Sequence, residues 1–426
     1  MIRIFNFAEV PAEEVFARTQ PTENVSGAVA EIIAEVRARG DAALFDFARK
    51  FDRTELTELA VSPEEIQEAL DAVDPALLEV MRKSAANIRK FHSRQIQNNY
   101  IINDEDGIVM GMKVLPVDSA GLYVPGGTAA YPSSVLMDSI PAKIAGVRQL
   151  VMVTPPNREG KVNPVILAAA AVAGVDRIYK VGGAQAIAAL AYGTETIPRV
   201  DKIVGPGSAF VAEAKRQVYG QVSIDMVAGP SEILMVADGK ANPRVAAADL
   251  LSQAEHDKNA SAVLVTDSPE LALAVQAELE RQIPLLDRHE IARASIDNNG
   301  KIIVADSLEQ AIGIANEIAP EHLELCVDNP FDYLDKVRHA GSVFLGRSCP
   351  EALGDYFAGT NHTLPTGGRA RFSSPLSVDD FVKKMQYTYY SRDALARVAP
   401  DIAAFARAEG LTGHARSAMI RTEEKA

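Results

Sequence analysis

The first hundred residues place hydrophobic and polar positions at the spacing of amphipathic helices. Apolar residues recur every three or four positions between 29 and 36, up to Gly40, and this spacing predicts a helix with one buried face. Two further helix starts are marked by a capping residue followed by proline, at Ser62-Pro63 and at Asp74-Pro75. We expect the last of these helices to bury its apolar face and to leave His92, near its end, on the surface.

The pattern changes after about residue 121, where short apolar segments alternate with glycine and alanine-rich helices. This alternation is typical of βαβ units and therefore of parallel sheets. We expect one sheet before the segment Asp225–Glu232 and a second sheet after it. The predicted strands are Gln149–Thr154, Arg177–Val181 and Lys202–Val204 in the first sheet, and Ile233–Val236, Ser261–Thr266, Lys301–Val304 and Ser342–Leu345 in the second.

Both ends of the chain are too short to form a core of their own. Residues 1–20 are amphipathic and end before Pro21, so we expect them to dock on another part of the protein or on a partner subunit. Residues 104–107 predict a turn between two extended segments. Beyond Pro375 the pattern becomes helical, with residues 378–382 opening one helix, and we expect this tail to lie across a second subunit.

The composition narrows the class of protein. The chain has 426 residues, of which 47% are hydrophobic and 23% charged, which is typical of a well-cored protein of two or more domains. A formal net charge of −14 without acidic tracts disfavours nucleic acid and anionic membranes as partners. Glutamates lie near the N-terminus, where a signal peptide would need an apolar core, so we expect a cytoplasmic protein. Prolines interrupt the uncharged run Ser119–Met137, so we expect no transmembrane segment. The two cysteines, Cys326 and Cys349, could form at most one disulfide.

Gln253 and His256 form half of a candidate metal site. They lie three residues apart at the predicted end of a helix that begins near Pro243, so their side chains could share one face and bind one ion. Two ligands do not complete a site. A solvated helix end explains this stretch equally well.

Two glycine turns, at 181–185 and 204–208, each join a predicted strand to a predicted helix. Helix N-termini at such turns favour anions or polar ligand groups. Neither turn matches the G-x-G-x-x-G pattern of dinucleotide-binding proteins, and tight packing between strand and helix is the simpler interpretation of each turn alone.

Four other stretches contain a histidine, an acidic residue or both, and each has an ordinary structural interpretation. Glu321-His322 could open a helix after Pro320, Asp355 could be a turn residue, and His362 a loop residue. The four stretches are Ala319–Leu323, Gly354–Tyr356, Thr360–Gly368 and Ala408–His414. The chain has no H-E-x-x-H, G-x-S-x-G or Walker pattern, which removes several hydrolase classes.

Taken together and in this order, five stretches resemble the histidinol dehydrogenase family. They are IDMVAGPSEILMVAD, SQAEHD, PEHLEL, GDYFAGTNHTLPTGGRARFSSPLSVDDF and EGLTGH, and the resemblance covers nearly the whole chain. It implies that the protein binds one zinc ion per active site and oxidises L-histidinol through L-histidinal to L-histidine. It also implies that two NAD molecules accept the hydrides, in the last steps of histidine biosynthesis.

The resemblance also implies roles for individual residues around the zinc. The zinc ligands would be Gln253, His256, Asp355 and His414. Two imidazoles and two oxygen ligands suit zinc and leave coordination positions for substrate. His322 would take the alcohol proton, and Glu321 would activate the water that attacks the aldehyde. The expected substrate contacts are these zinc ligands and His322, together with Ser231, His362 and Glu409.

For NAD, the resemblance implies contacts from Tyr123, Gln185 and Ser208. The family usually has asparagine at the position of Ser208. Asparagine offers a donor and an acceptor at longer reach, so serine could weaken one cofactor contact or make it through water.

The fold implied by the resemblance is α/β, with two incomplete Rossmann-like parallel-sheet domains, small N- and C-terminal helical segments, and an intertwined homodimer with shared active sites. We expect four parts. They are an N-terminal docking segment at 1–20, a zinc-binding and catalytic domain at 21–122 and 231–375, an inserted NAD-binding domain at 123–230, and a C-terminal segment at 376–426 that reaches the partner subunit.

Two alternatives remain open. A related enzyme could keep this scaffold and oxidise another polar alcohol, although the matches at His362 and Glu409 argue against it. A structural zinc protein without catalysis is the second alternative, and the presence of both Glu321 and His322 argues against that one.

Overall fold

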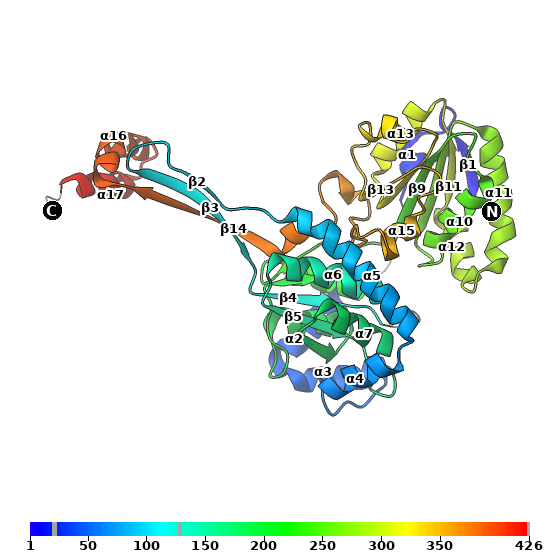
Figure 1. The fold of residues 1–426 in the computed structure, drawn as a ribbon, viewed down its shortest axis with the longest axis horizontal. Coiled ribbons are helices and arrows are strands. Elements are labelled where there is room, and N and C mark those ends of the chain that lie inside the picture. Colours follow the sequence, from blue (N-terminus) through cyan, green and yellow to red (C-terminus); the bar gives the residue numbers. More distant parts are fainter. Residues whose placement is uncertain (19–23, 127–129, 424–426) are drawn as a thin grey trace. The chain divides into compact units, whose positions relative to one another are not determined.

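The computed structural model describes residues 1–18, 24–126 and 130–423 (Figure 1). The chain divides into two compact units. The larger unit comprises residues 1–95 and 118–381, and the smaller comprises residues 96–117 and 382–426. Within the described residues, no helix is long and apolar enough to cross a membrane. Cys326 and Cys349 are both free thiols.

The larger unit contains a five-stranded parallel sheet in the order β6-β5-β4-β7-β8. Its central strands are buried on both faces, as expected for a parallel sheet covered by helices. The three strands predicted here are confirmed, two of them with the same bounds. The strands are β4 (Ser119–Tyr123), β5 (Gln149–Thr154), β6 (Arg177–Lys180), β7 (Lys202–Val204) and β8 (Ser223–Ile224).

Helices from two parts of the chain cover this sheet. Those of the sheet's own βαβ units are α6 (Pro132–Ala145), α7 (Pro164–Ala173), α8 (Gly183–Tyr192) and α9 (Ala209–Val218). The helices predicted in the first hundred residues are also present, as α2 (Ser26–Arg39), α4 (Pro63–Ala72) and α5 (Pro75–His92). Ser62 and Asp74 cap α4 and α5 as expected. Helix α2 packs on α8 and α9, and α4 and α5 pack on α6 and α7. Residues 26–92 therefore belong with this sheet. This arrangement differs from the expected grouping of residues 21–122 with residues 231–375.

His92 is fully buried, so its expected place on the surface is wrong. Its Nδ1 lies 2.7 Å from Oε1 of Gln95, and the same oxygen accepts a hydrogen bond from the backbone N–H of Val378. The end of α5 is therefore covered by a segment that lies far away in the sequence, which periodicity within the helix could not reveal.

The second sheet of the larger unit has six parallel strands in the order β1-β11-β10-β9-β12-β13. The four strands predicted here are confirmed. The strands are β1 (Arg3–Asn6), β9 (Glu232–Ala237), β10 (Ser261–Thr266), β11 (Lys301–Val304), β12 (His322–Cys326) and β13 (Ser342–Leu345). One face is covered by α10 (Pro243–Ala254), α11 (Pro269–Gln282) and α12 (His289–Asn299), and the other by α13 (Leu308–Ile318).

Two strands of this sheet were not predicted. β12 follows Pro320, which on its own suggested a helix start at Glu321-His322, but all five residues of the strand are buried between β9 and β13. β1 pairs in parallel with β11, and the short helix α1 (Ala12–Phe16) buries Val15 against the same sheet. The N-terminal segment thus docks on its own chain, and the boundary expected at residues 20 and 21 lies outside the described residues.

The smaller unit is an antiparallel sheet followed by a pair of helices. Its strands are β2 (Tyr100–Ile102), β3 (Ile108–Pro116) and β14 (Val382–Tyr390), and its helices are α16 (Arg392–Ala408) and α17 (Thr412–Glu423). The predicted pair of extended segments around residues 104–107 is confirmed as β2 and β3. The helix predicted to open at 378 is wrong, because only a 3₁₀ turn forms at Val378–Phe381 and the chain continues as β14, whose tyrosines and threonine favour a strand once β3 offers an edge.

Candidate active site

The backbone of Glu232 fixes two acid-base side chains at the start of neighbouring strands. Glu232 begins β9, and His322 begins β12 beside it in parallel register. The Glu232 N–H donates to Oε2 of Glu321 at 2.8 Å, and the Glu232 carbonyl oxygen lies 2.9 Å from Nδ1 of His322. Because a carbonyl oxygen can only accept, Nδ1 carries the imidazole hydrogen, and Nε2 is left with a lone pair. That Nε2 is buried and makes no hydrogen bond.

Burial sets the protonation of both groups. Burial lowers the pKa of His322, and the charge of Glu351 and the hydrogen bond to the Glu232 carbonyl only partly offset this, so the imidazole is neutral near pH 7. Burial also raises the pKa of Glu321 well above its ordinary value, against the hydrogen bond from the Glu232 N–H. His322 is thus a proton acceptor, with Glu321 Oε2 3.5 Å from its Nδ1.

Arg18 holds the side chain of Glu232 in place. Its guanidinium forms an ion pair with the Glu232 carboxylate and donates to the carbonyl oxygen of Ile318. The N-terminal segment therefore anchors the residue whose backbone positions Glu321 and His322.

Helix α15 (Glu351–Tyr356) brings two carboxylates to the imidazole. Oε1 of Glu351 lies 3.6 Å from Nε2 of His322, and Oδ1 of Asp355 lies 3.9 Å from the same nitrogen. Burial and then the charge of Glu351 raise the pKa of Asp355 well above its ordinary value. One ligand atom from each of these three residues lies within 4.8 Å of the others, so the group could hold a metal ion.

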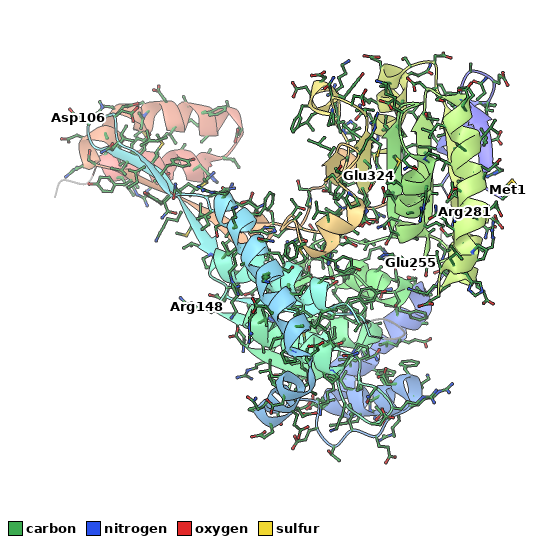
Figure 2. The ribbon with its side chains drawn as sticks, turned by 45° about the vertical axis from the view of Figure 1, so that its right-hand side comes forward. Met1, Asp106, Arg148, Glu255, Arg281 and Glu324 are labelled. Carbon is green, nitrogen blue, oxygen red and sulfur yellow. The ribbon has the colours of Figure 1, made fainter. Side chains whose placement is uncertain are left out.

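The end of α10 contributes Gln253 and His256. The helix ends at Ala254 with Glu255 as its C-cap (Figure 2), so His256 lies in the following turn and not on the helix itself. Gln253 is 1% exposed, and neither atom of its amide group has a hydrogen-bond partner. Oγ of the adjacent Ser252 lies 3.3 Å from Oε2 of Glu351, which places this helix end beside α15.

His362 is held by the loop that follows α15. Asn361 donates to the carbonyl oxygen of Met137 at 2.8 Å, and Oγ1 of Thr363 donates to Oδ1 of Asp138 at 2.7 Å. Burial, followed by the charge of His322, lowers the pKa of His362 to about 4, so its imidazole is neutral near pH 7. The loop thus presents a second imidazole that is neutral near pH 7.

The residues expected to contact NAD gather at the glycine turns of the five-stranded sheet. The buried Tyr123, at the end of β4, accepts a hydrogen bond from the N–H of Gly183 through its hydroxyl at 3.1 Å. Gln185 is buried in the first turn of α8, and Ser208 is the exposed N-cap of α9, with no side-chain capping bond. Because β4 and β7 are neighbours from which the chain winds in opposite directions, this is the switch point at which α/β sheets commonly bind ligands.

Glu409 and His414 belong to the smaller unit. Glu409 caps α16, His414 lies in the first turn of α17, and both side chains are exposed. Ser231 directly precedes β9 and is partly buried.

The donor set in the larger unit fits a bound metal ion. Buried polar atoms are almost always hydrogen-bonded, yet the Gln253 amide, Nε2 of His322 and Oε1 of Glu351 are buried without partners. Nε2 of His322 lies 3.6 Å from Oε1 of Glu351 and 3.9 Å from Oδ1 of Asp355, and buried carboxylates are costly unless they are paired or bind a metal. An amide oxygen, imidazole nitrogens and carboxylates together form a set that zinc accepts.

Comparison with known proteins decides the family. The sequence profile of histidinol dehydrogenase matches residues 16–422. The chain belongs to the histidinol dehydrogenase family. Relatives include histidinol dehydrogenases of Geobacillus kaustophilus, 56% identical over 95% of both chains, and Clostridium acetobutylicum, 53% identical over 99% of both chains. The crystal structure of histidinol dehydrogenase from Elizabethkingia anophelis superposes with a TM-score of 0.94 at 39% identity, covering 99% of this chain and 98% of that one. The chain is therefore an oxidoreductase of this family.

In this histidinol dehydrogenase family member, sequence reasoning missed Glu351. The residue lies one turn before Asp355, so the i, i+4 spacing of two acidic residues was a signal available in the sequence. The structure shows that α15 begins at Glu351 and that the Glu351 side chain is buried beside His322.

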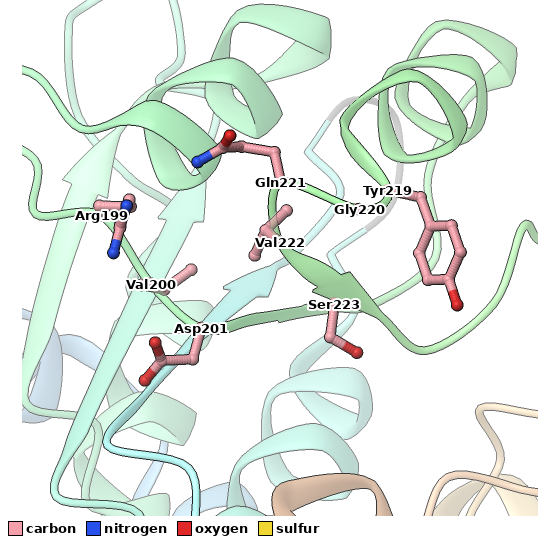
Figure 3. A pocket seen from close by; sticks show the side chains of 8 residues that line it. All are labelled: Arg199, Val200, Asp201, Tyr219, Gly220, Gln221, Val222 and Ser223. Atoms are coloured by element: carbon pink, nitrogen blue, oxygen red, sulfur yellow. The ribbon is translucent and has the colours of Figure 1, made fainter. Parts of the chain in front are cut away.

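A separate pocket of about 320 Å³ lies at the opposite end of β7 from the glycine turns (Figure 3). It is lined by Arg199–Asp201 and Tyr219–Ser223. Its carboxylate, Asp201, already accepts hydrogen bonds from the backbone of Asp118 and from the backbone and side chain of Ser119. This pocket contains none of the residues expected at the active site.

Proposed function

We propose that the protein oxidises L-histidinol through L-histidinal to L-histidine, with zinc at the active site and two NAD molecules as hydride acceptors. One observation carries the proposal within this family. His322 is a neutral imidazole whose Nε2 makes no hydrogen bond, and the same peptide group fixes it and Glu321. With Glu351 and Asp355 it forms a cluster of metal-ligand type. An alcohol oxidation needs a proton acceptor of this kind.

The residues that would hold the metal are Gln253, His256 and Asp355, together with the partner subunit's His414. When bound, zinc supplies a Lewis-acidic centre that holds the imidazole and amine of the substrate, and NAD supplies the hydride acceptor. Ser231, His362 and the partner subunit's Glu409 would contact the rest of the substrate. Fixing the substrate in this way removes much of the entropic cost of reaching the reactive geometry.

In the first oxidation, Nε2 of His322 accepts the hydroxyl proton of histidinol while a hydride leaves its carbon. Glu321 then accepts a proton from the water that adds to the aldehyde. His322 releases its proton to solvent, and in the second oxidation it accepts the hydroxyl proton of the hydrated aldehyde as the second hydride leaves. The Glu232 peptide keeps both side chains in register through these steps, because its N–H and its carbonyl group each bind one of them.

NAD reduction measured spectrophotometrically tests this function. Histidinol should give two NADH per molecule, whereas other amino alcohols and sulfonated alcohols should give little or none. A stoichiometry of one, or a clear preference for another alcohol, would contradict the proposal and favour a related enzyme on the same scaffold.

We also propose that the protein is a homodimer whose active sites are shared. The smaller unit exposes large apolar side chains, including Ile101 (63% exposed), Tyr389 (59%) and Phe405 (72%), which supports a role in docking. Glu409 and His414 are exposed on the same unit, where they could reach a partner's site.

Mixing inactive chains tests the shared site. If His256→Ala and His414→Ala chains are combined, about half the dimers are mixed, and each mixed dimer has one intact shared site, so activity should return to roughly a quarter of wild type. No recovery, with subunit exchange confirmed by mass spectrometry, would show that each site is built from one chain.

A further inference from the structure

Glu351 has no role in the reaction as proposed, although it lies at the centre of the site. Its side chain is 2% exposed, and its Oε1 makes no hydrogen bond. A buried, unpartnered carboxylate oxygen is uncommon in a folded protein and requires an explanation.

The contacts of Glu351 reach two other elements of the site, β12 and α10. Its Oε1 lies 3.6 Å from Nε2 of His322 on β12, and its Oε2 lies 3.3 Å from Oγ of Ser252 on α10. Its backbone N–H donates to Oε1 of the buried Glu324, also on β12 (Figure 2), at 2.8 Å. Asp355 follows one turn later on the same helix.

The charge of Glu351 has no protein partner that could balance it. Among the described residues, His322 is the one basic side chain in ion-pair range of Glu351, and neither Nε2 of His322 nor Oε1 of Glu351 makes a hydrogen bond. Burying an uncompensated carboxylate is costly, and a second carboxylate beside it adds repulsion. A cation between Glu351 and Asp355 would remove both penalties.

We propose that Glu351 is a residue of the metal centre and supplies a second carboxylate oxygen beside Asp355. The inference rests on the proposed zinc dependence and goes beyond the four ligands that the family resemblance implies. With Asp355 as the one carboxylate, a divalent cation would keep an excess positive charge, and with Glu351 the two carboxylates neutralise it. Oε1 is free for this bond, and it belongs to the group of ligand atoms that lie within 4.8 Å of one another.

Zinc affinity, measured by competition with a chromophoric chelator, tests the proposal without relying on activity. Glu351→Gln keeps the size of the side chain and removes its charge, and it should weaken zinc binding by at least tenfold. Asp249→Asn is the matched control, because Asp249 is a largely buried carboxyl on the neighbouring α10 that lies outside the cluster of ligand atoms. Its zinc affinity should change by less than about threefold.

Two further readouts separate a ligand from a merely structural residue. With cobalt in place of zinc, the visible absorption bands of Glu351→Gln should shift, because one oxygen ligand is lost. Without metal, Glu351→Gln should melt at a higher temperature than the wild type, since one of two repelling carboxylates is gone. A structural residue would lower the melting temperature and leave the cobalt spectrum unchanged.

An unchanged zinc affinity and cobalt spectrum in Glu351→Gln, with wild-type protein binding one zinc per site, would overturn the role of Glu351 and leave the proposed function intact. Wild-type protein that binds no zinc would overturn both. A loss of affinity of similar size in Asp249→Asn would also overturn the proposal, because it would show a general effect of nearby negative charge.

Discussion

The two parallel sheets of the larger unit share one strand order, but their candidate functional residues lie at opposite ends of the strands. Numbered along the chain, β4 to β8 lie in the order 3-2-1-4-5, and β9 to β13 repeat that order with β1 added at one edge. In the five-stranded sheet, Tyr123 and the glycine turns lie at the carboxyl ends of the strands. In the six-stranded sheet, Glu232 and His322 lie at the amino ends.

The two edges differ in which ends of the neighbouring helices they carry. Helices α8 and α9 begin at the carboxyl edge of the five-stranded sheet, where free N–H groups and the positive ends of the helix dipoles suit the phosphates of a dinucleotide. Helix α10 ends at the amino edge of the six-stranded sheet, and Gln253 lies in its last turn, where the negative end of the dipole suits a cation. Under the proposed function, one topology would thus provide an anion site at one edge and a cation site at the other.

The largest expected effect comes from removing the proton acceptor at the amino edge. His322→Gln should lower kcat by about 10²- to 10⁴-fold, the range associated with general-base catalysis, and leave the KM for NAD nearly unchanged. Steady-state kinetics with each substrate varied in turn measure both. A rise in the KM for NAD comparable to the loss in kcat would contradict the separation of the two edges.

Asp138 lies on α6, a helix that covers the five-stranded sheet. It accepts a hydrogen bond from Thr363 in the loop that carries His362. Burial raises the pKa of Asp138 from 3.8 to about 7, with the hydrogen bond from Thr363 and the charge of Lys215 opposing and the charge of Asp225 adding to it. Because the pKa of Asp138 is higher in the folded state than in the unfolded state, the contribution of this carboxyl group to the free energy of unfolding is complete below about pH 4. That contribution is lost as the pH rises to about 7.

Asp138→Asn should remove this dependence. Above pH 7 the free energy of unfolding of the variant should exceed that of the wild type by up to about 4 kcal/mol, since one pKa unit corresponds to about 1.4 kcal/mol. Urea unfolding at pH 5 and pH 8 measures the difference. Equal changes with pH in the two proteins would show that Asp138 does not titrate in this range.

Glu321→Gln tests whether Glu321, at the amino edge of the six-stranded sheet, activates the water for the aldehyde step. Oxidation of histidinal should slow by about 100-fold and oxidation of histidinol much less, because the aldehyde step alone needs an activated water. Separate half-reaction assays with each substrate provide the comparison. An equal loss in both steps would count against Glu321 as the residue that activates water.

Gly205 and Gly220 form a matched pair on opposite edges of the five-stranded sheet, because Gly205 follows β7 at the carboxyl edge and Gly220 precedes β8 at the amino edge. Both have positive φ, +111° and +99°, but a Cβ atom at Gly205 would collide with the Tyr123 carbonyl oxygen, whereas one at Gly220 would meet nothing within 4 Å. Alanine should therefore cost about 1 to 3 kcal/mol of backbone strain at both positions, and at Gly205 alone should also raise the KM for NAD. Equal NAD affinities in the two variants would mean that the turn at 205 does not shape the cofactor site.

Local periodicity predicted the strands that are buried in regular βαβ units. β5 and β11 have the bounds expected from their apolar runs, and α4 and α5 begin at the expected caps. β12 and β14 were missed because their identity depends on a partner strand, β9 in one case and β3 in the other, that lies far away in the sequence. Burial of His92 by a distant segment was missed for the same reason.

For the site, the residue pattern offered Gln253 and His256 as half of a candidate metal site, with a solvated helix end as an equal alternative, and the resemblance supplied the remaining roles. Neither revealed that the backbone of Glu232 binds both Glu321 and His322, because a main-chain contact leaves no mark on residue type. The position of Glu351 was also hidden, since an acidic residue at the start of a helix is common for reasons of capping and dipole alone.

The separation of the two edges is tested most directly by measuring NAD and histidinol binding on the same protein before and after chelation of its metal. The account predicts that the Kd for NAD stays within about twofold, because its contacts lie at the glycine turns, while histidinol binding is lost and returns when zinc is added. A parallel loss of NAD binding, or undiminished histidinol binding by the metal-free protein, would contradict it.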